Sequence, residues 1–385
     1  MKAILALEDG TTFEGSSIGA VGTVTGEMCC DTSVMGYQEI LSDPACSGRV
    51  MAMTYPLIGN YGICAEDDES AAAGATGLVV TELARLHSNW RADEPMEPWL
   101  ERRGIVGIAG IDTRKIATLQ RNSGALRCCI STELTADEAI AAAKAAPTIE
   151  GAYLVSNVST PTTYHWEGES RAWKLPNKTQ GDLTTYCELP PVSYKVIVYD
   201  LGVRYSTLRS LRQVGCDVTV VPASTPANEA LALRPDAVVI SDGPGDPAVL
   251  SDIAAEVKDL ADKLPIAGIG LGCQVIATAM GATTRKLHVG HQGCNQPVKC
   301  TATGKVEITT QNNLFTINTD SLPQELQVTA VNLNDDTIAA LTHSKLPVFG
   351  VQYLPAAPAG ADDSANFYNR LVTTIKAVKA GQYNA

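Results

Sequence analysis

The chain has 385 residues, more than one hydrophobic core usually organises, so its length predicts two domains. Apolar residues make up 45% of the chain and charged residues 18%, which favours an ordered globular protein over a disordered one. The net charge of -13 argues against nucleic acid as a partner, because binding to a phosphate backbone requires a basic surface.

The amino-terminal segment MKAILALEDG has a five-residue apolar run, too short for a secretory signal or a membrane span. We therefore expect a cytoplasmic protein with no membrane association. The eleven cysteines are scattered and include the adjacent pairs Cys29-Cys30 and Cys128-Cys129, which predicts reduced, mostly buried thiols rather than disulfides. Neither a CxxC pair nor a Cys/His cluster with zinc spacing occurs, so we expect no metal site.

Residues 1–152 carry Gly-punctuated runs with the composition of β-strands, among them AILALEDGTTFEG and GLVVTEL. One clear helical pattern, ELTADEAIAAAKAA, follows these runs, with Thr132 or Thr135 as its candidate amino-terminal cap. This half is therefore predicted to be a β-rich α+β domain. Polar and Pro-rich sequence without periodicity comes next, and we assign residues 153–192 to a linker.

Residues 193–385 alternate short apolar runs with helical patterns, as in a sheet of parallel strands joined by crossover helices. Helices are expected at YSTLRSLRQVG, after Leu250, at LGCQVIATAMG and in the final segment DDSANFYNRLVTTIKAVKA. We predict an α/β domain with a mostly parallel sheet and flanking helices. Its strands are predicted at residues 195–200, 217–222, 236–241, 265–270 and 347–352.

Ligands of such sheets bind at the carboxyl ends of the strands, where three segments have the composition of a functional site. The turn SDGPGDP (241–247) is rigid, and its backbone N–H groups are suited to an oxyanion, although a plain connecting turn is the alternative. The segment GIGLGCQ (268–274) leads from a strand into a helix with the spacing of a nucleophile elbow, but its central residue, Gly270, has no side chain. The segment VQYLPAA (351–357) contains neither a base nor a carboxylate.

The order and spacing of these segments resemble the class I glutamine amidotransferases, whose elbow reads G-x-C-x-G-x-Q and whose later motif supplies a histidine and a glutamate. In the first half, TSVMGYQEILSDPACSG, TYPLIGNYG and GIAGIDTRKI resemble the amino-terminal domain of the carbamoyl-phosphate synthetase small subunit. The resemblance covers essentially the whole chain. It assigns residues 1–152 to that small-subunit domain and residues 193–385 to an amidotransferase-like domain.

In that family a thiolate attacks the glutamine amide, a histidine moves protons, and a glutamate orients the histidine. By position these roles fall on Gly270, Leu354 and Ala356, which are chemically inert, so the resemblance implies that ordinary glutamine hydrolysis is absent. Leu314 replaces a glycine that is usual in the family, and we expect its side chain to fill substrate space. By resemblance, the glutamine pocket comprises Ser47, Gly243, Gly245, Leu271, Gln274, Asn312, Leu314 and Phe315.

Other residues are candidates for a chemical role. Cys273 lies three residues past the elbow, but a buried helix cysteine is the favoured interpretation over a substitute nucleophile. His288 and His291 are the nearest candidates for a replacement base, with a structural role favoured. The cluster Asp112–Lys115 is a candidate anion site, for which a solvated or interface face is the favoured account. Arg204 is expected near the entrance to the pocket, and its role stays open.

We expect a small subunit that forms a heterodimer with a carbamoyl-phosphate synthetase large subunit and leaves that subunit to use free ammonia with bicarbonate and ATP. By resemblance, ATP and Mg²⁺ belong to the large subunit, and this chain holds no cofactor. Glutamine or a related small ligand is a candidate for the pocket. Two alternatives stay open: an amidase or amidotransferase with altered chemistry, and a free-standing ligand-binding scaffold. The sequence does not decide between pyrimidine and arginine biosynthesis.

Overall fold

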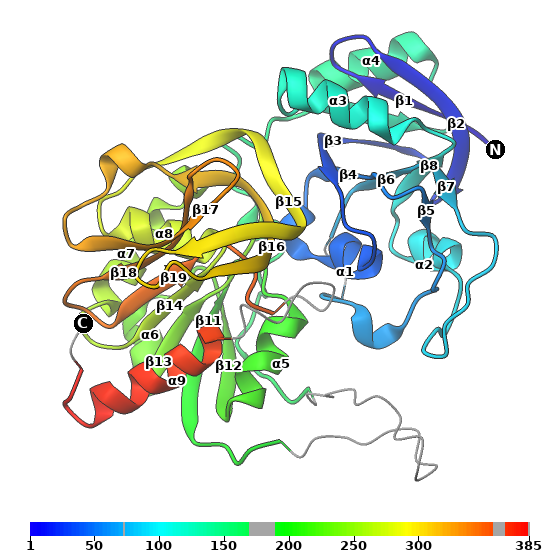
Figure 1. Cartoon of the computed structure of the whole chain (residues 1–385). Coiled ribbons are helices and arrows are strands. Elements are labelled where there is room, and N and C mark those ends of the chain that lie inside the picture. The colour runs from blue at the N-terminus through cyan, green and yellow to red at the C-terminus, as the bar shows by residue number, and fades with distance from the viewer. Residues whose placement is uncertain (72–73, 169–188, 357–365, 384–385) are drawn as a thin grey trace.

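The computed structural model describes residues 1–71, 74–168, 189–356 and 366–383. Within these ranges the chain forms two bodies that lie side by side (Figure 1). The amino-terminal half closes into a barrel, and the carboxyl-terminal half forms a large sheet with helices on both faces. The structure thus confirms the predicted fold class, a β-rich α+β domain followed by an α/β domain.

Seven strands form the amino-terminal barrel, and alternate side chains from them fill its interior. Leu5, Leu7, Met28 and Ile130 are examples, each 1% exposed or less. Closure pairs the two outer strands with each other, so the barrel presents no free sheet edge. Around the barrel the strands are β1 (Lys2–Leu7), β2 (Thr12–Gly19), β8 (Val106–Ala109), β6 (Gly77–Val80), β4 (Arg49–Met53), β3 (Thr23–Asp31) and β9 (Arg127–Ser131).

The helix predicted near the end of this half is present, and Thr135 is its cap. The Glu138 backbone N–H donates to the Thr135 hydroxyl, and the Thr135 N–H donates to the Glu138 carboxylate at 2.9 Å, which together form a capping box. The helix is α4 (Ala136–Ala145), and the other short elements of this half are α1 (Tyr37–Ser42), α2 (Met96–Arg102), β5 (Leu57–Ile58) and β7 (Glu82–Leu83).

A further helix, α3 (Thr113–Ser123), was not predicted. Asp112, suggested by the sequence as part of an anion site, caps this helix by accepting a hydrogen bond from the Lys115 N–H at 2.9 Å. Arg114 and Lys115 are exposed in its first turn. This arrangement agrees with the favoured account of Asp112–Lys115 as a solvated or interface face.

The carboxyl-terminal half forms a ten-stranded sheet whose centre is parallel. All five strands predicted from apolar runs are present there, and the crossover helices between them produce the parallel order. Across the sheet the strands are β10 (Tyr164–His165), β12 (Cys216–Pro222), β11 (Tyr194–Asp200), β13 (Ala237–Ile240), β14 (Ile266–Ile269), β19 (Val348–Val351), β18 (Ile338–His343), β17 (Leu326–Asn332), β15 (Thr284–Cys300) and β16 (Val306–Ile317).

An antiparallel extension of β15 to β18 continues this sheet toward the barrel, and the sequence did not indicate it (Figure 1). Its longest strands, β15 and β16, carry mixed polar residues, and their pairing has register shifts after Lys286 and after Gly293. Such a pattern lacks the alternation that marks a strand in a sequence. The segment assigned to a linker also contributes an edge strand, β10, while its residues 169–188 lie outside the described ranges.

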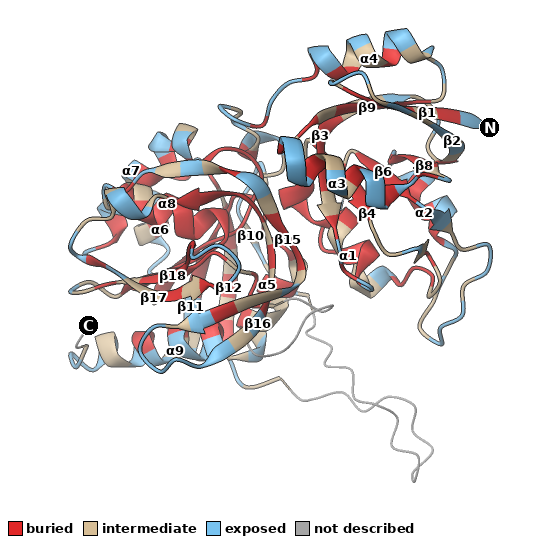
Figure 2. Ribbon diagram, turned by 45° about the horizontal axis from the view of Figure 1, so that its top comes forward, coloured by how far each residue is buried: buried red, intermediate tan, exposed pale blue. Residues whose placement is uncertain are grey.

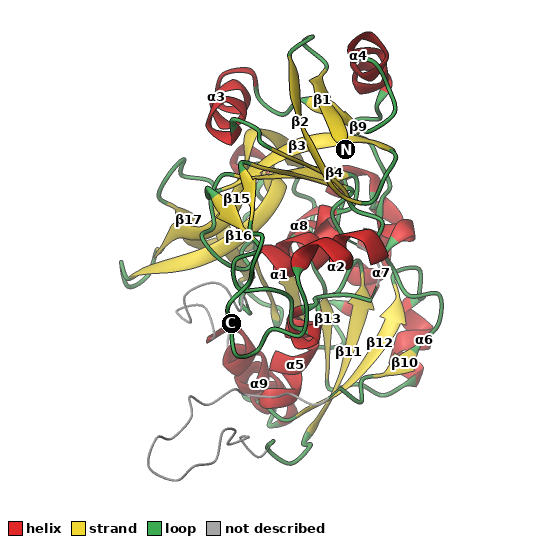
Figure 3. Ribbon diagram, turned by 90° about the vertical axis from the view of Figure 1, so that its right-hand side faces the viewer, coloured by secondary structure: helices red, strands yellow, loops and turns green. Residues whose placement is uncertain are grey.

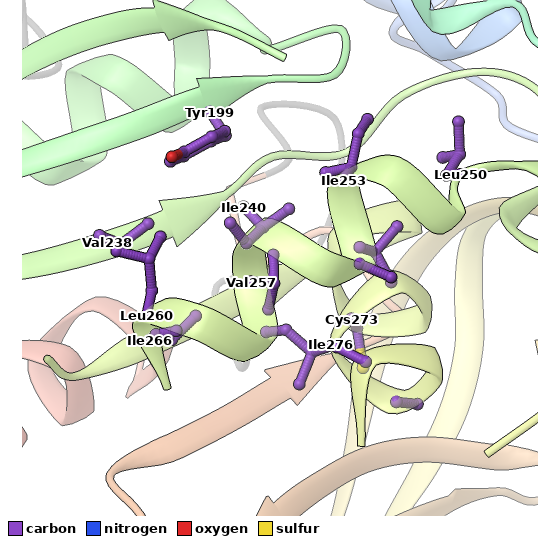
Figure 4. Packing of buried hydrophobic residues seen from close by; sticks show 14 of the residues in the cluster. Tyr199, Val238, Ile240, Leu250, Ile253, Val257, Leu260, Ile266, Cys273 and Ile276 are labelled. Atoms are coloured by element: carbon purple, nitrogen blue, oxygen red, sulfur yellow. The ribbon is translucent and has the colours of Figure 1, made fainter. Parts of the chain in front are cut away.

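Helices cover both faces of the sheet, as Figure 3 shows from the side. On β11, Val196 and Val198 face α5 (Tyr205–Gln213) and α9 (Asn366–Lys379), while Ile197 and Tyr199 face the opposite helices. Those opposite helices pack against Tyr199, Val238 and Ile240 (Figure 4). They are α6 (Ala227–Ala232), α7 (Ser251–Leu260) and α8 (Leu271–Ala279).

Burial follows these layers, with buried residues concentrated inside both bodies (Figure 2). The ten cysteines in the described ranges are free, and seven of them are buried, as predicted. No helix in the described part of the chain combines the length and apolar character that a membrane crossing needs.

Candidate functional site

The three segments singled out from the sequence follow strands β13, β14 and β19. These strands are neighbours and run parallel, so their carboxyl ends meet at one edge of the sheet. Two hydrogen bonds join the segments directly. The Gly270 N–H donates to the Val351 carbonyl at 2.8 Å, and the Leu271 N–H donates to the Asp242 carboxyl at 2.9 Å. The structure therefore assembles one site from turns that are far apart in the sequence.

Gly270 has the backbone of a nucleophile elbow. Its φ of 53° and ψ of -116° lie in a region that residues with a side chain rarely adopt, and α8 begins directly after it. A nucleophile on such a turn is exposed at a helix amino terminus, where a thiolate is stabilised. The backbone therefore has the form of a nucleophile elbow, and its central residue, Gly270, has no side chain.

The carboxyl group of Asp242 fills the space beside Gly270. A Cβ atom added to Gly270 would lie 2.1 Å from Asp242 Oδ1 and 2.4 Å from its Cγ, closer than real atoms approach. Asp242 is 7% exposed, and its carboxyl accepts a hydrogen bond from the Leu271 N–H. Asp242 was not predicted as a site residue, because its contact with Leu271 joins loops that follow different strands.

Burial raises the pKa of Asp242 to about 7, and the negative charge of Asp43 acts in the same direction. The backbone N–H groups of Leu271 and Gly243 and the charge of Arg204 oppose this shift. Below about pH 7 the folded chain therefore favours the protonated carboxyl of Asp242. In the unfolded chain the same carboxyl ionises near its ordinary pKa of about 4.

The raised pKa predicts how Asp242→Asn changes stability with pH. Between about pH 4 and pH 7 the unfolded chain ionises Asp242 and the folded chain does not, so ionisation lowers the stability of the native chain as pH rises. Asparagine does not titrate and keeps an acceptor for the Leu271 N–H. We expect the melting temperature of the variant relative to the native chain to increase from pH 5 to pH 8, as measured by calorimetry. A melting-temperature difference that stays constant or decreases from pH 5 to pH 8 would contradict the raised pKa of Asp242.

The two residues that the sequence resemblance assigns to the base and its orienting acid, Leu354 and Ala356, carry alkyl side chains. Leu354 is 4% exposed and packs in the cluster beneath α5 and α9, and its N–H donates to the Thr310 carbonyl at 2.8 Å. Ala356 packs against the same cluster, and its carbonyl accepts a hydrogen bond from the Ser206 hydroxyl at 3.3 Å. Neither side chain binds or releases a proton.

Gln274 and Asn312, two residues of the expected glutamine pocket, are engaged in internal hydrogen bonds. The Gln274 side-chain amide donates to the Phe315 carbonyl at 2.7 Å and to Gln352 Oε1 at 2.8 Å. The Asn312 side chain accepts from Arg49 at 2.7 Å and donates to Asp43 at 3.0 Å. Gln274 thus joins helix α8 to β16 and to the end of β19, and Asn312 joins the two halves of the chain.

The other expected pocket residues lie in several places. Ser47 lines a cavity of about 240 Å³ with Thr76 and Arg103, whereas Asn312 and Leu354 line a different cavity of about 30 Å³. Leu314 is 3% exposed and packs in the cluster beneath α1 and α2, against the barrel. Gly243 and Gly245 lie close to the Leu201 and Ala152 carbonyls, while Leu271 opens α8.

Cys273 and the two histidines make contacts of other kinds. Cys273 is fully buried among the side chains of α7 and α8, and burial raises the pKa of its thiol (Figure 4). His291 forms a 2.8 Å contact with Asp335, and His288 is exposed beside Gly124 at the end of α3. Neither histidine lines either of the two cavities. These placements agree with structural interpretations of all three residues.

Arg204 lies at the junction between the two halves, where it lines the cavity of about 30 Å³ together with Asn312 and Leu354. It is 5% exposed, and its guanidinium pairs with Glu69 at 2.8 Å and lies 3.8 Å from Asp43. Both carboxylates belong to the amino-terminal half, so the pair holds the two bodies together. In the described ranges, no three His, Cys, Asp or Glu side chains gather as a metal site requires.

The fold and the site define a class of protein: an amidotransferase-type α/β domain with a nucleophile elbow, preceded by a β-barrel domain. Residues 197–374 match the family described as glutamine amidotransferase class-I. Residues 5–130 match the CPSase domain of the carbamoyl-phosphate synthase small chain.

Comparison with whole proteins indicates the same family. The chain is 49% identical over 380 residues to the carbamoyl phosphate synthase small chain of Akkermansia muciniphila, covering 98% of this chain and 99% of that protein. It is 44% identical over 384 residues to the protein of the same name from Syntrophotalea carbinolica, covering 99% of this chain and all of that protein. The chain therefore belongs to the carbamoyl phosphate synthase small chain family, which confirms the resemblance seen in the sequence.

Proposed function

We propose that this chain is the small subunit of a cytoplasmic carbamoyl-phosphate synthetase and does not hydrolyse glutamine itself. A large subunit would then use free ammonia with bicarbonate and ATP, and would hold the ATP and Mg²⁺. Membership of the family along nearly the whole chain supports the partner. The observation that carries the loss of hydrolysis is the elbow, where Gly270 supplies no nucleophile and the Asp242 carboxyl fills the adjacent space.

Acyl transfer from glutamine needs a nucleophile, a base and hydrogen-bond donors for the oxyanion. Gly270 and Leu354 remove the first two, and the Leu271 N–H, a candidate donor, is already bound to Asp242. Loss of a nucleophile and its base typically lowers turnover by about 10⁶-fold. Cys273 does not replace the nucleophile, because its thiol is buried among apolar side chains.

A subunit without chemistry can still act through binding. A protein that binds one state of its partner shifts the population toward that state, and this requires an interface but no triad. The buried ion pair of Arg204 with Glu69 keeps the two halves of this chain in one arrangement, which would present a fixed surface to the large subunit.

The nitrogen donor used by the purified complex tests this proposal. We expect carbamoyl phosphate to form with ammonium and not with glutamine, at equal concentrations of bicarbonate and ATP. The large subunit alone and a complex with Cys273→Ala serve as controls. Glutamine-dependent synthesis that needs this chain and survives Cys273→Ala would contradict the proposal and demand another nucleophile.

A further inference from the structure

Asp242 binds the backbone N–H of Leu271, the residue that opens helix α8. The first N–H groups of a helix have no partner within the helix, and the helix dipole favours an acidic group beside them. Asp242 Oδ1 accepts a hydrogen bond from the Leu271 N–H, with 2.9 Å between the oxygen and the nitrogen. We call this N–H at the start of α8 the cradle. The side chain that accepts this hydrogen bond, Asp242, lies in the loop after β13 and not in the helix itself.

The cradle has a defined place relative to the elbow. In a nucleophile elbow, the backbone N–H of the residue after the nucleophile donates to the oxyanion, and here that residue is Leu271. An oxygen of Asp242 therefore lies where the acyl oxygen of a substrate would accept this bond. The carboxyl also fills the space that a side chain at position 270 would need.

We propose that Asp242 is a built-in ligand of the cradle, which closes the emptied site to amides and carboxylates from solution. This inference rests on the proposed function, because it states what fills the site once the nucleophile is absent. Gly270 and Asp242 form a reciprocal pair, since the missing side chain of one makes room for the carboxyl of the other. The site is thus closed by a side chain of the chain itself rather than left open.

Asp242→Ala tests the proposal, with formate as the probe because it replaces the carboxyl group that the substitution removes. We expect the melting temperature of this variant to rise with formate in a saturable way, at pH 8 and constant ionic strength with chloride as the reference salt. The native chain and Asp242→Asn should show no such rise, because their side chains still occupy the cradle. Equal formate responses in the native chain and the alanine variant would overturn the proposal, and so would a folded alanine variant without a response.

Amide hydrogen exchange in the native chain keeps the proposal testable if Asp242→Ala does not fold. The Leu271 N–H should exchange more slowly than first-turn amides of α7, whose cap residue, Leu250, has only an alkyl side chain. Exchange as fast as in α7 would show that the carboxyl does not occupy the cradle. Both measurements are independent of the nitrogen donor. These measurements can therefore contradict the closure of the site by Asp242 without contradicting the proposed function. The nitrogen-donor assay can likewise contradict the proposed function without contradicting that closure.

Discussion

Gly270→Ala is expected to destabilise the chain by about 2–6 kcal/mol, although it adds a single methyl group. Holding a side chain at φ 53° and ψ -116° costs roughly 1–3 kcal/mol. The new Cβ would also displace the Asp242 carboxyl, which leaves the buried Leu271 N–H without an acceptor at a cost of roughly 1–3 kcal/mol. Urea unfolding of the native chain and the variant measures the sum.

Gly104→Ala is the matched control for backbone strain. Gly104 has a φ of 67°, and an added Cβ would meet no atom within 4 Å, so only the left-handed backbone contributes, about 1–2 kcal/mol. In the Asp242→Ala background, Gly270→Ala should cost only the backbone strain, because the carboxyl that its Cβ would displace is already absent. Equal costs at the two glycines, or an equal cost of Gly270→Ala with and without the Asp242 carboxyl, would show that Asp242 does not occupy this space.

Arg204→Met is expected to cost about 3–5 kcal/mol, because it leaves a buried carboxylate without its partner. Glu69 is 1% exposed, and Arg204 supplies its ion pair across the junction of the two halves. The loss should appear in urea unfolding and as faster proteolysis of the junction. Adding Glu69→Gln should restore part of the stability, since the amide oxygen still accepts the bond that the Ser206 N–H gives to Glu69.

An exposed ion pair provides the comparison. Lys379 contacts Asp236 at 2.6 Å, but its side chain is 52% exposed, so Lys379→Met should cost less than about 1 kcal/mol. Similar losses of stability in Arg204→Met and Lys379→Met would mean that burial does not determine how much the Arg204–Glu69 ion pair contributes to stability.

The central strands could be predicted from the sequence because each is a short apolar run buried on both faces. Val196 to Tyr199 illustrate this, since alternate residues pack against helices on opposite sides of the sheet. The β15–β16 pair could not be predicted, because bulges and mixed polar residues remove its periodicity. Helix α3 was missed because its charged first turn was interpreted as a solvated or interface face, with an anion site as the alternative, and not as the start of a helix that Asp112 caps.

The sequence indicated which three segments form the candidate site, but not which side chain fills the space beside Gly270. The spacing of glycines located the elbow at Gly270, and the structure places it beside Asp242 and the end of β19. The role of Asp242 depends on a contact between loops that follow different strands, which sequence spacing does not describe. The same holds for Arg204, whose partner Glu69 is 135 residues away in the chain.

Release of glutamate from glutamine by the purified complex, during turnover with bicarbonate and ATP, tests the central claim most directly. The family resemblance assigns the catalytic positions to Gly270, Leu354 and Ala356, so under the proposal this chain should add no glutamate release to that of the large subunit alone. Carbamoyl phosphate should meanwhile accumulate when ammonium is supplied. Glutamate released in step with carbamoyl phosphate, and only when this chain is present, would contradict the account.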